Sequence, residues 1–403
     1  MRYAARLKRE TGFPDVFYPL GFAKNSKDRT FEISKLIADN DLDPHTDSVN
    51  FSLQTMGPGA LEAVGRKNIS LRGYRDLADR YAAEGYNLHP DLILPLPGET
   101  LDSFREGYAE LASWEHVSRI QVYACSLLPN SPMADPDYVR AWQIETRLTP
   151  LGMPFDASAD IETETVDAVV ATRSMTEAEY VEAKVFVALV RALELHRLLR
   201  PVRCFVGLHS DLPVWSFYVR FARWQEENHG LLASTLGRVR VAVAASLTRD
   251  ELVWPWMCAA RDGSYVYYHK ALALDVLNEP ARFVGELRRM LVEEFTMDDG
   301  EVLDELLRYQ RDQWVPPDFD PSVPAGYRFE YRLDWIAYLE GGEPLVERPI
   351  RVTYAPPEMW AEHRYVRSTE AWRRVVLIEH MAYADHCCFS ARHRRVGALG
   401  HQT

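Results

Sequence analysis

The first third of the chain alternates between short apolar runs and longer segments with apolar residues at helical spacing. The strand-like runs lie at residues 16–23, 48–56, 87–97 and 119–128, and the first is continuously apolar, as is typical of a buried parallel strand. The intervening segments predict helices at residues 26–40, 59–68, 70–84 and 100–111. Strands that alternate with helices pair in parallel through right-handed crossovers. The pattern therefore predicts an α/β fold with about four parallel strands.

The first apolar run, VFYPLGFA at residues 16–23, is too apolar to form a free edge of the sheet. A free edge exposes unpaired backbone donors and acceptors, so we expect earlier barrel strands, a second copy or a separate partner chain beside it. Upstream of it, residues 1–12 predict only an amphipathic helix. We therefore expect residues 1–155 to form the second half of a (β/α) barrel, a partial barrel whose first strands are missing from the chain.

The pattern changes near residue 155. A proline-rich stretch at residues 127–142 and the segment LTPLGMPF at residues 148–155 are interpreted as loops that mark a domain boundary. Residues 156–403 then predict a mainly helical α+β domain. Its expected elements are a strand at 164–175, helices at 181–199, 214–227, 281–295 and 300–314, and a late β-hairpin at 327–339 and 347–356. Thr176 and Glu179 form a capping box that begins the first of these helices.

Composition narrows the classes of protein. The chain has 403 residues, of which 47% are hydrophobic and 26% charged, and this is ordinary for a soluble globular protein. A net charge of -13 argues against a nucleic-acid partner, because phosphate binding needs a basic surface. No apolar run is long enough to span a bilayer and no signal peptide opens the chain, so we expect no membrane partner. The 5 cysteines form no disulfide framework, which favours the cytoplasm.

Polar residues gather where the predicted strands end. In a β/α barrel the carboxyl ends of the strands face the active site. These side chains are mainly hydrogen-bonding groups, with no nucleophile beside a base, and such a set suits a polar organic cofactor better than hydrolysis. The candidates are Lys24, Asn25, Ser52, Gln54, Asp91, the elbow Pro97-Gly98-Glu99, Gln121, Tyr123 and Ser126.

Each candidate also has a structural interpretation. Ser52 and Gln54 could form the outward side of an alternating strand, and Asp91 could cap a neighbouring helix. Glu99 and Thr100 could stabilise a helix N-terminus through the dipole and a cap alone. The set as a whole carries more weight than any single member.

Four segments carry a resemblance to a known family. They read FAKNSKDRTFEISKLIADNDL, VNFSLQTMGPGALEAVGRKNI, LILPLPGETLDSFREGY and IQVYACSLLPNSPM. In this order they resemble, over about residues 14–135, the second half of the radical SAM barrel in enzymes with an N-terminal cobalamin-binding domain. The family's fourth strand reads like SLQS before a helix ending in RKN, its fifth like LILGLPGET and its sixth like IQVYPLxLLPGTP. The stretches SMTEAEYVEA and RYQRDQWVPPDF are similar to the family's carboxyl-terminal region.

The resemblance implies which residues bind S-adenosylmethionine. Contacts come from Ser52 and Gln54, from the strand bearing Asp91 and Leu94, and from the backbone near Val122 and Tyr123, with Asn25 as a further cofactor-binding candidate. It also implies a [4Fe–4S] cluster that cleaves S-adenosylmethionine to a 5′-deoxyadenosyl radical. A cobalamin often carries a methyl group for transfer to an unactivated carbon of a small-molecule substrate.

The chain departs from the family in its cysteines. The family holds its cluster with a CxxxCxxC motif, because thiolates are the usual iron–sulfur ligands, and these 403 residues contain no such spacing. Nor do they contain a cobalamin-binding domain. We expect no metal site at residues 380–393, where adjacent Cys387 and Cys388 lie near histidines, because adjacent cysteines rarely ligate one tetrahedral ion.

Three hypotheses follow from these departures. The chain is expected to be a fragment of a cobalamin-dependent radical SAM enzyme, inactive without a missing N-terminal half. Alternatively, it is a non-catalytic binding or scaffold protein descended from that family. A third hypothesis is an ordinary barrel enzyme that uses Asp91 or Glu99 as an acid or base.

Overall fold

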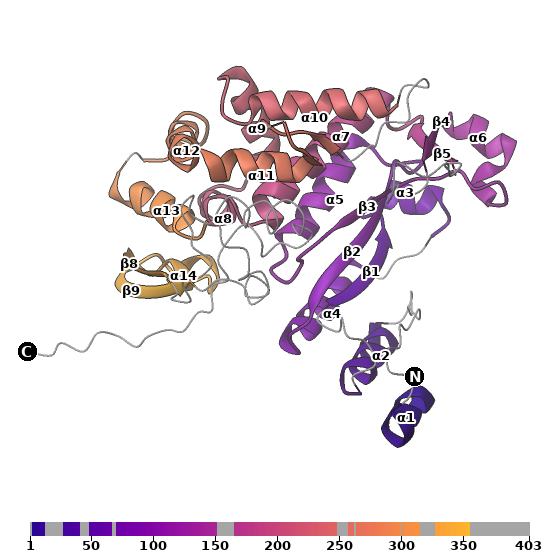
Figure 1. Ribbon diagram of the computed structural model, residues 1–403, viewed down its shortest axis with the longest axis horizontal. Coiled ribbons are helices and arrows are strands. Elements are labelled where there is room, and N and C mark those ends of the chain that lie inside the picture. The colour runs from indigo at the N-terminus through magenta and orange to yellow at the C-terminus, as the bar shows by residue number, and fades with distance from the viewer. Residues whose placement is uncertain are drawn as a thin grey trace, which may run out of the picture. The chain divides into compact units, whose positions relative to one another are not determined.

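The computed structural model describes residues 2–12, 27–40, 48–66, 70–150, 165–247, 257–261, 263–298, 300–314 and 327–354 (Figure 1). The chain divides into two compact units, Met1–Tyr180 and Val181–Thr403. The domain boundary predicted near residue 155 falls in residues 151–164, outside the described residues, and stays a prediction.

A parallel sheet forms the centre of the first unit. Its strands β1 (Ser48–Gln54), β2 (Asn87–Leu94) and β3 (Gln121–Ala124) lie in the order β1-β2-β3 (Figure 1). These strands confirm three of the predicted apolar runs and the α/β class. The run at residues 16–23 lies outside the described residues, so the partial barrel stays a prediction.

Helices precede and connect the strands as the periodicity predicts. They are α1 (Arg2–Thr11), α2 (Lys27–Ala38), α3 (Pro58–Ala63), α4 (Leu71–Ala83) and α5 (Leu101–Ser113). Helix α4 packs against β2 and buries Tyr74, Leu77 and Tyr81. Because apolar residues recur every three or four positions in α4 and α5, each helix presents one buried face and one polar face.

The segment after β3 contains regular structure that sequence reasoning missed. Residues interpreted as loops form a short 3₁₀ turn (Pro132–Ala134), helix α6 (Pro136–Trp142) and strand β4 (Glu145–Pro150), which pairs antiparallel with β5 (Thr165–Ala171). The loop interpretation was wrong because proline is well suited to the first turn of a helix. Pro136 begins α6, and the Asp135 carboxylate caps it by accepting from the Asp137 and Tyr138 amides at 2.8 and 3.3 Å.

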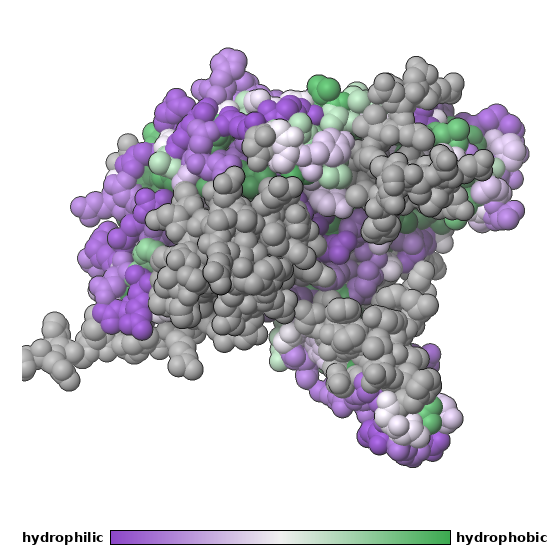
Figure 2. Space-filling view, viewed as in Figure 1, coloured by the Kyte–Doolittle hydropathy of each residue, from purple (hydrophilic) through white to green (hydrophobic). Residues whose placement is uncertain are grey.

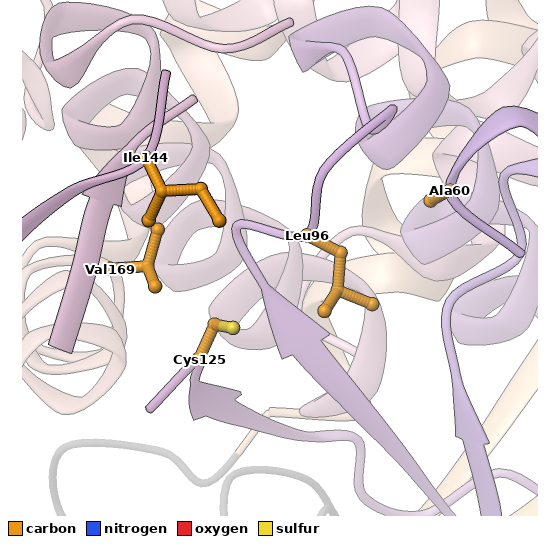
Figure 3. Packing of buried hydrophobic residues seen from close by; sticks show 5 residues of the cluster. All are labelled: Ala60, Leu96, Cys125, Ile144 and Val169. Atoms are coloured by element: carbon orange, nitrogen blue, oxygen red, sulfur yellow. The ribbon is translucent and has the colours of Figure 1, made fainter. Parts of the chain in front are cut away.

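A buried cluster joins this hairpin to the sheet. The Val169 amide donates to the Cys125 carbonyl at 2.7 Å, so β5 continues beside the end of β3. Ile144 and Val169 then lie near Cys125, which faces Leu96 of the segment after β2 (Figure 3). Ala60 completes the cluster. This core therefore lies at the carboxyl end of the parallel strands.

The second unit is mainly helical. Helix α7 (Glu177–Val190) begins in the first unit and passes into a π-helical turn (Arg191–Leu195). Two short strand pairs accompany the helices: β6 (Met257–Ala259) with β7 (Tyr265–Tyr267), and β8 (Tyr327–Leu333) with β9 (Glu347–Tyr354). The other helices are α8 (Arg200–His209), α9 (Val214–Glu227), α10 (Ala233–Ser246), α11 (Tyr268–Asn278), α12 (Pro280–Phe295), α13 (Glu301–Arg311) and α14 (Trp335–Leu339).

The hydropathy of this unit's surface follows the helix pattern. Helices α12 and α13 bury one apolar stripe each, and Figure 2 shows hydrophilic residues over their outer side. Within the described ranges, no helix combines the length and the apolar character that crossing a bilayer requires.

Thr176 and Glu179 form the predicted capping box of α7. The Glu179 amide donates to the Thr176 hydroxyl oxygen at 3.2 Å, and the Thr176 amide donates to the Glu179 carboxylate at 2.7 Å. Hydrogen bonds from the Thr176 backbone and hydroxyl lower the pKa of Glu179. Because this pKa is lowered, the Glu179 carboxylate stabilises the folded chain above its unfolded-state pKa. This stabilisation is lost as the pH falls through the folded-state pKa.

Replacing Thr176 with alanine is therefore expected to lower the free energy of unfolding by about 1 kcal/mol at neutral pH. The difference between the two proteins should shrink below the pKa of Glu179, because the protonated carboxyl is a weaker acceptor. Urea unfolding of both proteins across this pH range measures the effect. An unchanged urea midpoint at neutral pH would contradict the cap.

Candidate functional site

One face of the parallel sheet is polar. Along β2, the side chains of Leu88, Leu92 and Leu94 are buried, whereas Asp91 is half-buried on the opposite face. Neighbouring residues of parallel strands share a face, so the register extends this polar face across all three strands. We call its side chains the polar row: Asn50, Ser52, His89, Asp91, Gln121 and Tyr123.

Hydrogen bonds connect the centre of the polar row. The Asn50 amide donates to the Asp91 carboxylate at 2.6 Å, and the Ser52 hydroxyl donates to the Asn50 amide oxygen at 3.3 Å. Ser52 lies directly beside Asp91 in the register. The Arg66 guanidinium, from the RKN motif, donates to the Ser52 carbonyl at 2.8 Å and so holds the end of β1. Ser52 and Asp91, two predicted cofactor-binding residues, are thus brought together.

The electrostatics of the row centre on Asp91. Burial raises the pKa of this carboxyl, while the Asn50 hydrogen bond and the charge of Arg119 act in the opposite direction. Burial and the nearby Asp91 charge also raise the pKa of the Tyr123 phenol. The Tyr123 side chain is 51% exposed, so its ring offers an open surface at the edge of the row. The site can therefore accept hydrogen bonds through Asp91 and contact a flat group through Tyr123.

Other predicted residues lie elsewhere. Leu94 and Val122 are buried on the opposite face, so only their backbone could contact a ligand, as the resemblance implies for Val122. Gln54 follows an irregularity in β1, has a φ of 66° and pairs with Leu92, so it lines a small recess beside α5 and does not join the row. Asn25 and Lys24 lie outside the described residues.

Sequence reasoning missed Asn50 and Arg119. Asn50 lies two residues before Ser52 and therefore on the same face, a period that could have identified it. Arg119 precedes β3 and donates to the Gln121 side-chain oxygen at 2.8 Å. Nothing in the local sequence indicates that its charge acts on Asp91, because the two residues come from different strand segments.

The elbow Pro97-Gly98-Glu99 follows β2. Thr100 caps α5 as predicted, accepting from the Ser103 amide at 3.1 Å and donating its own amide to the Ser103 hydroxyl at 3.0 Å. Glu99 is buried, and its contacts differ from those of a helix cap. Its carboxylate accepts hydrogen bonds from the hydroxyls of Ser103 and Thr55. Burial raises the pKa of Glu99, and these two hydrogen bonds oppose that effect.

Gly98 allows the elbow to approach the loop after β1. Its φ is +82°, and a Cβ at this position would lie 2.5 Å from the Gly59 carbonyl oxygen. Gly85 is a matched control, because it has a φ of +84° with no neighbouring atom within 4 Å of such a Cβ.

Gly85→Ala is expected to lower the free energy of unfolding by about 1–2 kcal/mol, from the left-handed backbone alone. Gly98→Ala should lower it by a further ~1–3 kcal/mol, because the clashing atom belongs to the backbone and cannot rotate away. Chemical denaturation of both variants measures the difference. Equal losses would contradict the close approach.

The described thiols are buried or partly buried and are not grouped as metal ligands within the described ranges. Burial raises the pKa of Cys125 to about 12 and that of Cys258 to about 11, and burial also raises the pKa of Cys204. In the described ranges, no three residues of the types His, Cys, Asp and Glu are grouped as metal ligands. Cys387 and Cys388 lie outside those ranges.

No family model matches the chain. The chain is 32% identical over 378 residues to 2-(S-pantetheinyl)-carbapenam-3-carboxylate methyltransferase of Streptantibioticus cattleyicolor, covering 90% of this chain and 54% of that protein. It is 31% identical over 363 residues to the cobalamin-dependent radical SAM methyltransferase TokK of Streptomyces tokunonensis, covering 86% of this chain and 52% of TokK. The chain is a homologue of these methyltransferases.

This homology supports the family resemblance carried by the four sequence segments. The chain spans about half the length of these methyltransferases, 54% and 52%. The similarity reaches beyond residues 14–135, because each alignment covers at least 86% of the chain. Both compact units therefore contribute to it.

Proposed function

We propose that this chain provides the S-adenosylmethionine-binding strands and the carboxyl-terminal domain of a cobalamin-dependent radical SAM methyltransferase. The observation that carries the proposal is the polar row, which lies on the strands whose sequences resemble the family's cofactor-binding strands. The homology to two methyltransferases supports the reaction class. The substrate is a small molecule.

The polar row fits S-adenosylmethionine in its donor and acceptor chemistry. Asp91 can accept from hydroxyl or ammonium groups, and its hydrogen bond from Asn50 fixes one carboxylate oxygen. Ser52 supplies a further hydroxyl beside Asp91, and the exposed Tyr123 ring can pack on an apolar or flat part of the ligand. When bound, S-adenosylmethionine supplies the methyl group and the adenosyl radical that the family uses. The residues of this chain bind and orient it.

The described cysteines do not fit a [4Fe–4S] cluster. Such a cluster needs several thiolates converging on it, and the described thiols Cys125, Cys204 and Cys258 belong to no group of three potential metal ligands within the described ranges. The proposal therefore assigns the ligands of the cluster and of cobalamin to residues outside the described ranges or to a partner chain. The same partner would cover residues 16–23.

Anaerobic expression of the chain, with and without the sequence encoded immediately upstream, tests the proposal. Iron and sulfide content and transfer of labelled methyl from S-adenosylmethionine are measured in both preparations. We expect both preparations to bind S-adenosylmethionine and only the longer one to hold a cluster. A stoichiometric cluster in the shorter chain would overturn the interpretation of its thiols.

A second function is favoured by the same buried thiols. A non-catalytic relative would keep the fold and the polar row without the cluster chemistry. It would bind S-adenosylmethionine in both preparations and transfer no methyl group from either. Methyl transfer by the longer preparation removes this alternative.

A further inference from the structure

A buried carboxylate joins the loops that follow β1 and β2. Glu99, which is 1% exposed, accepts from the Thr55 hydroxyl through one oxygen and from the Ser103 hydroxyl at 2.6 Å through the other. Thr55 follows β1, whereas Ser103 belongs to α5 after the elbow. One ionisable side chain therefore spans two segments that are 44 residues apart in sequence. We call this arrangement the Glu99 clasp: Thr55, Gly57, Glu99 and Ser103.

The clasp is closely packed on its β1 side. The Gly57 amide donates to the Thr55 hydroxyl oxygen at 2.9 Å, so this hydroxyl bonds the backbone and the carboxylate together. A Cβ on Gly57 would lie 2.6 Å from a Glu99 carboxylate oxygen. Thr55 is itself only 2% exposed. A side chain at position 57 would therefore displace the Glu99 carboxylate, and Gly57 leaves room for it.

The clasp lies next to a strained turn of backbone. Gln54 has a left-handed φ of 66°, a conformation that residues other than glycine seldom adopt and that neighbouring contacts must hold in place. The irregularity of β1 lies between Ser52 and Gln54, directly before Thr55. The clasp therefore contacts the chain directly after β1, at Thr55, three residues after Ser52.

We propose that Glu99 is a positioning residue for the cofactor site, acting through Thr55 to hold the end of β1 so that Ser52 stays beside Asp91. This inference rests on the proposed function, in which the polar row binds S-adenosylmethionine. Glu99 is buried among Thr55, Ser103 and the elbow backbone and does not belong to the polar row. Its role is to fix the geometry of the row, and the binding groups are those of Ser52 and Asp91.

The two ends of the clasp give a matched test. Thr55→Val removes the hydroxyl on the β1 side with little change in volume, whereas Ser103→Ala removes the hydroxyl on the α5 side. Thr55→Val is expected to weaken S-adenosylmethionine binding about tenfold, because it removes the hydroxyl that bonds the Glu99 carboxylate and the Gly57 amide. Ser103→Ala should change affinity by less than about twofold although it also lowers stability, because the contact to β1 remains. Isothermal titration gives affinity, and urea unfolding of the same samples gives stability.

Three further variants separate positioning from folding. Thr55→Ser keeps the hydroxyl and should restore affinity to within about twofold of the unaltered chain. Glu99→Ala should weaken binding at least as much as Thr55→Val does, and the double variant should be no weaker than Glu99→Ala alone, because both changes remove the contact between Thr55 and Glu99. Glu106→Gln, an exposed change on the same helix, should leave affinity unaltered.

The outcomes distinguish this inference from the function on which it rests. Unchanged affinity in Thr55→Val together with weakened binding in Asp91→Asn would overturn the positioning role and leave the cofactor site standing. Equal weakening by Thr55→Val and Ser103→Ala would also overturn it, because the loss would then follow stability. Unchanged affinity in Asp91→Asn would instead contradict the proposed function.

Discussion

Asp91→Asn is expected to weaken S-adenosylmethionine binding roughly 10- to 100-fold, because a hydrogen bond to a charged acceptor contributes about 1.5–3 kcal/mol. The asparagine keeps the shape of the side chain and its contact with Asn50, but it removes the negative charge and one acceptor position. Isothermal titration with S-adenosylmethionine measures the change. Asp79→Asn, at an exposed position of α4, is the matched control and should bind as the unaltered chain does.

The pH dependence of binding checks the same residue. Because burial raises the pKa of Asp91, affinity should decline on acidification at a pH above the usual range for aspartate. Asp91→Asn should not show that decline. The free energy of unfolding of the free chain changes with pH in the opposite direction. Because the pKa of Asp91 is raised, the contribution of Asp91 to this free energy is present at low pH and is lost as the pH rises through the folded-state pKa. Equal pH profiles for the variant and the unaltered chain would contradict the assignment.

Glu194→Ala is expected to lower the free energy of unfolding of the second unit by about 3–5 kcal/mol. The Glu194 side chain is fully buried, accepts from Arg203 Nε at 3.1 Å and from the Tyr218 hydroxyl at 2.5 Å, and lies 3.7 Å from Arg200 Nε. Burial raises the pKa of Glu194, but the charges of Arg203 and Arg200 outweigh that effect and hold it below the usual value. Removing the carboxylate would leave two guanidinium groups buried without their acceptor.

An exposed glutamate provides the control for this loss. Glu227, on α9, lies 4.0 Å from Arg223 with 62% of its side chain exposed, and Glu227→Ala should change stability by less than about 0.5 kcal/mol. Urea unfolding followed by circular dichroism measures both variants. A loss below about 1 kcal/mol for Glu194→Ala would contradict the view that this network holds the π-helical turn to α8 and α9.

The sequence predicts those features that depend on local pattern. The apolar positions identify β1, β2 and β3, because buried residues alternate with polar ones along each strand, at the period of two that a strand requires. Caps are equally local, so Thr100 and Thr176 could be assigned from four residues each. The association of Ser52 with Asp91 follows from parallel register alone.

Features that depend on distant contacts could not be predicted. Gln54 was grouped with Ser52 because alternate residues of a strand share a face, but the irregularity between them breaks that rule. Helix α11 was missed because residues from Tyr268 to Leu277 are buried all round, which removes the amphipathic signal. The role of Glu99 depends on Thr55, 44 residues earlier, and no local pattern indicates that contact.

Photoaffinity labelling with 8-azido-S-adenosylmethionine, followed by peptide mapping, tests the central claim most directly. The account predicts label on peptides that contain β1, β2 or β3, within residues 48–54, 87–94 and 121–124, and loss of that label when unmodified S-adenosylmethionine competes. Label confined to residues 181–403, or label on the three strands that S-adenosylmethionine does not displace, would contradict a cofactor site on the polar row.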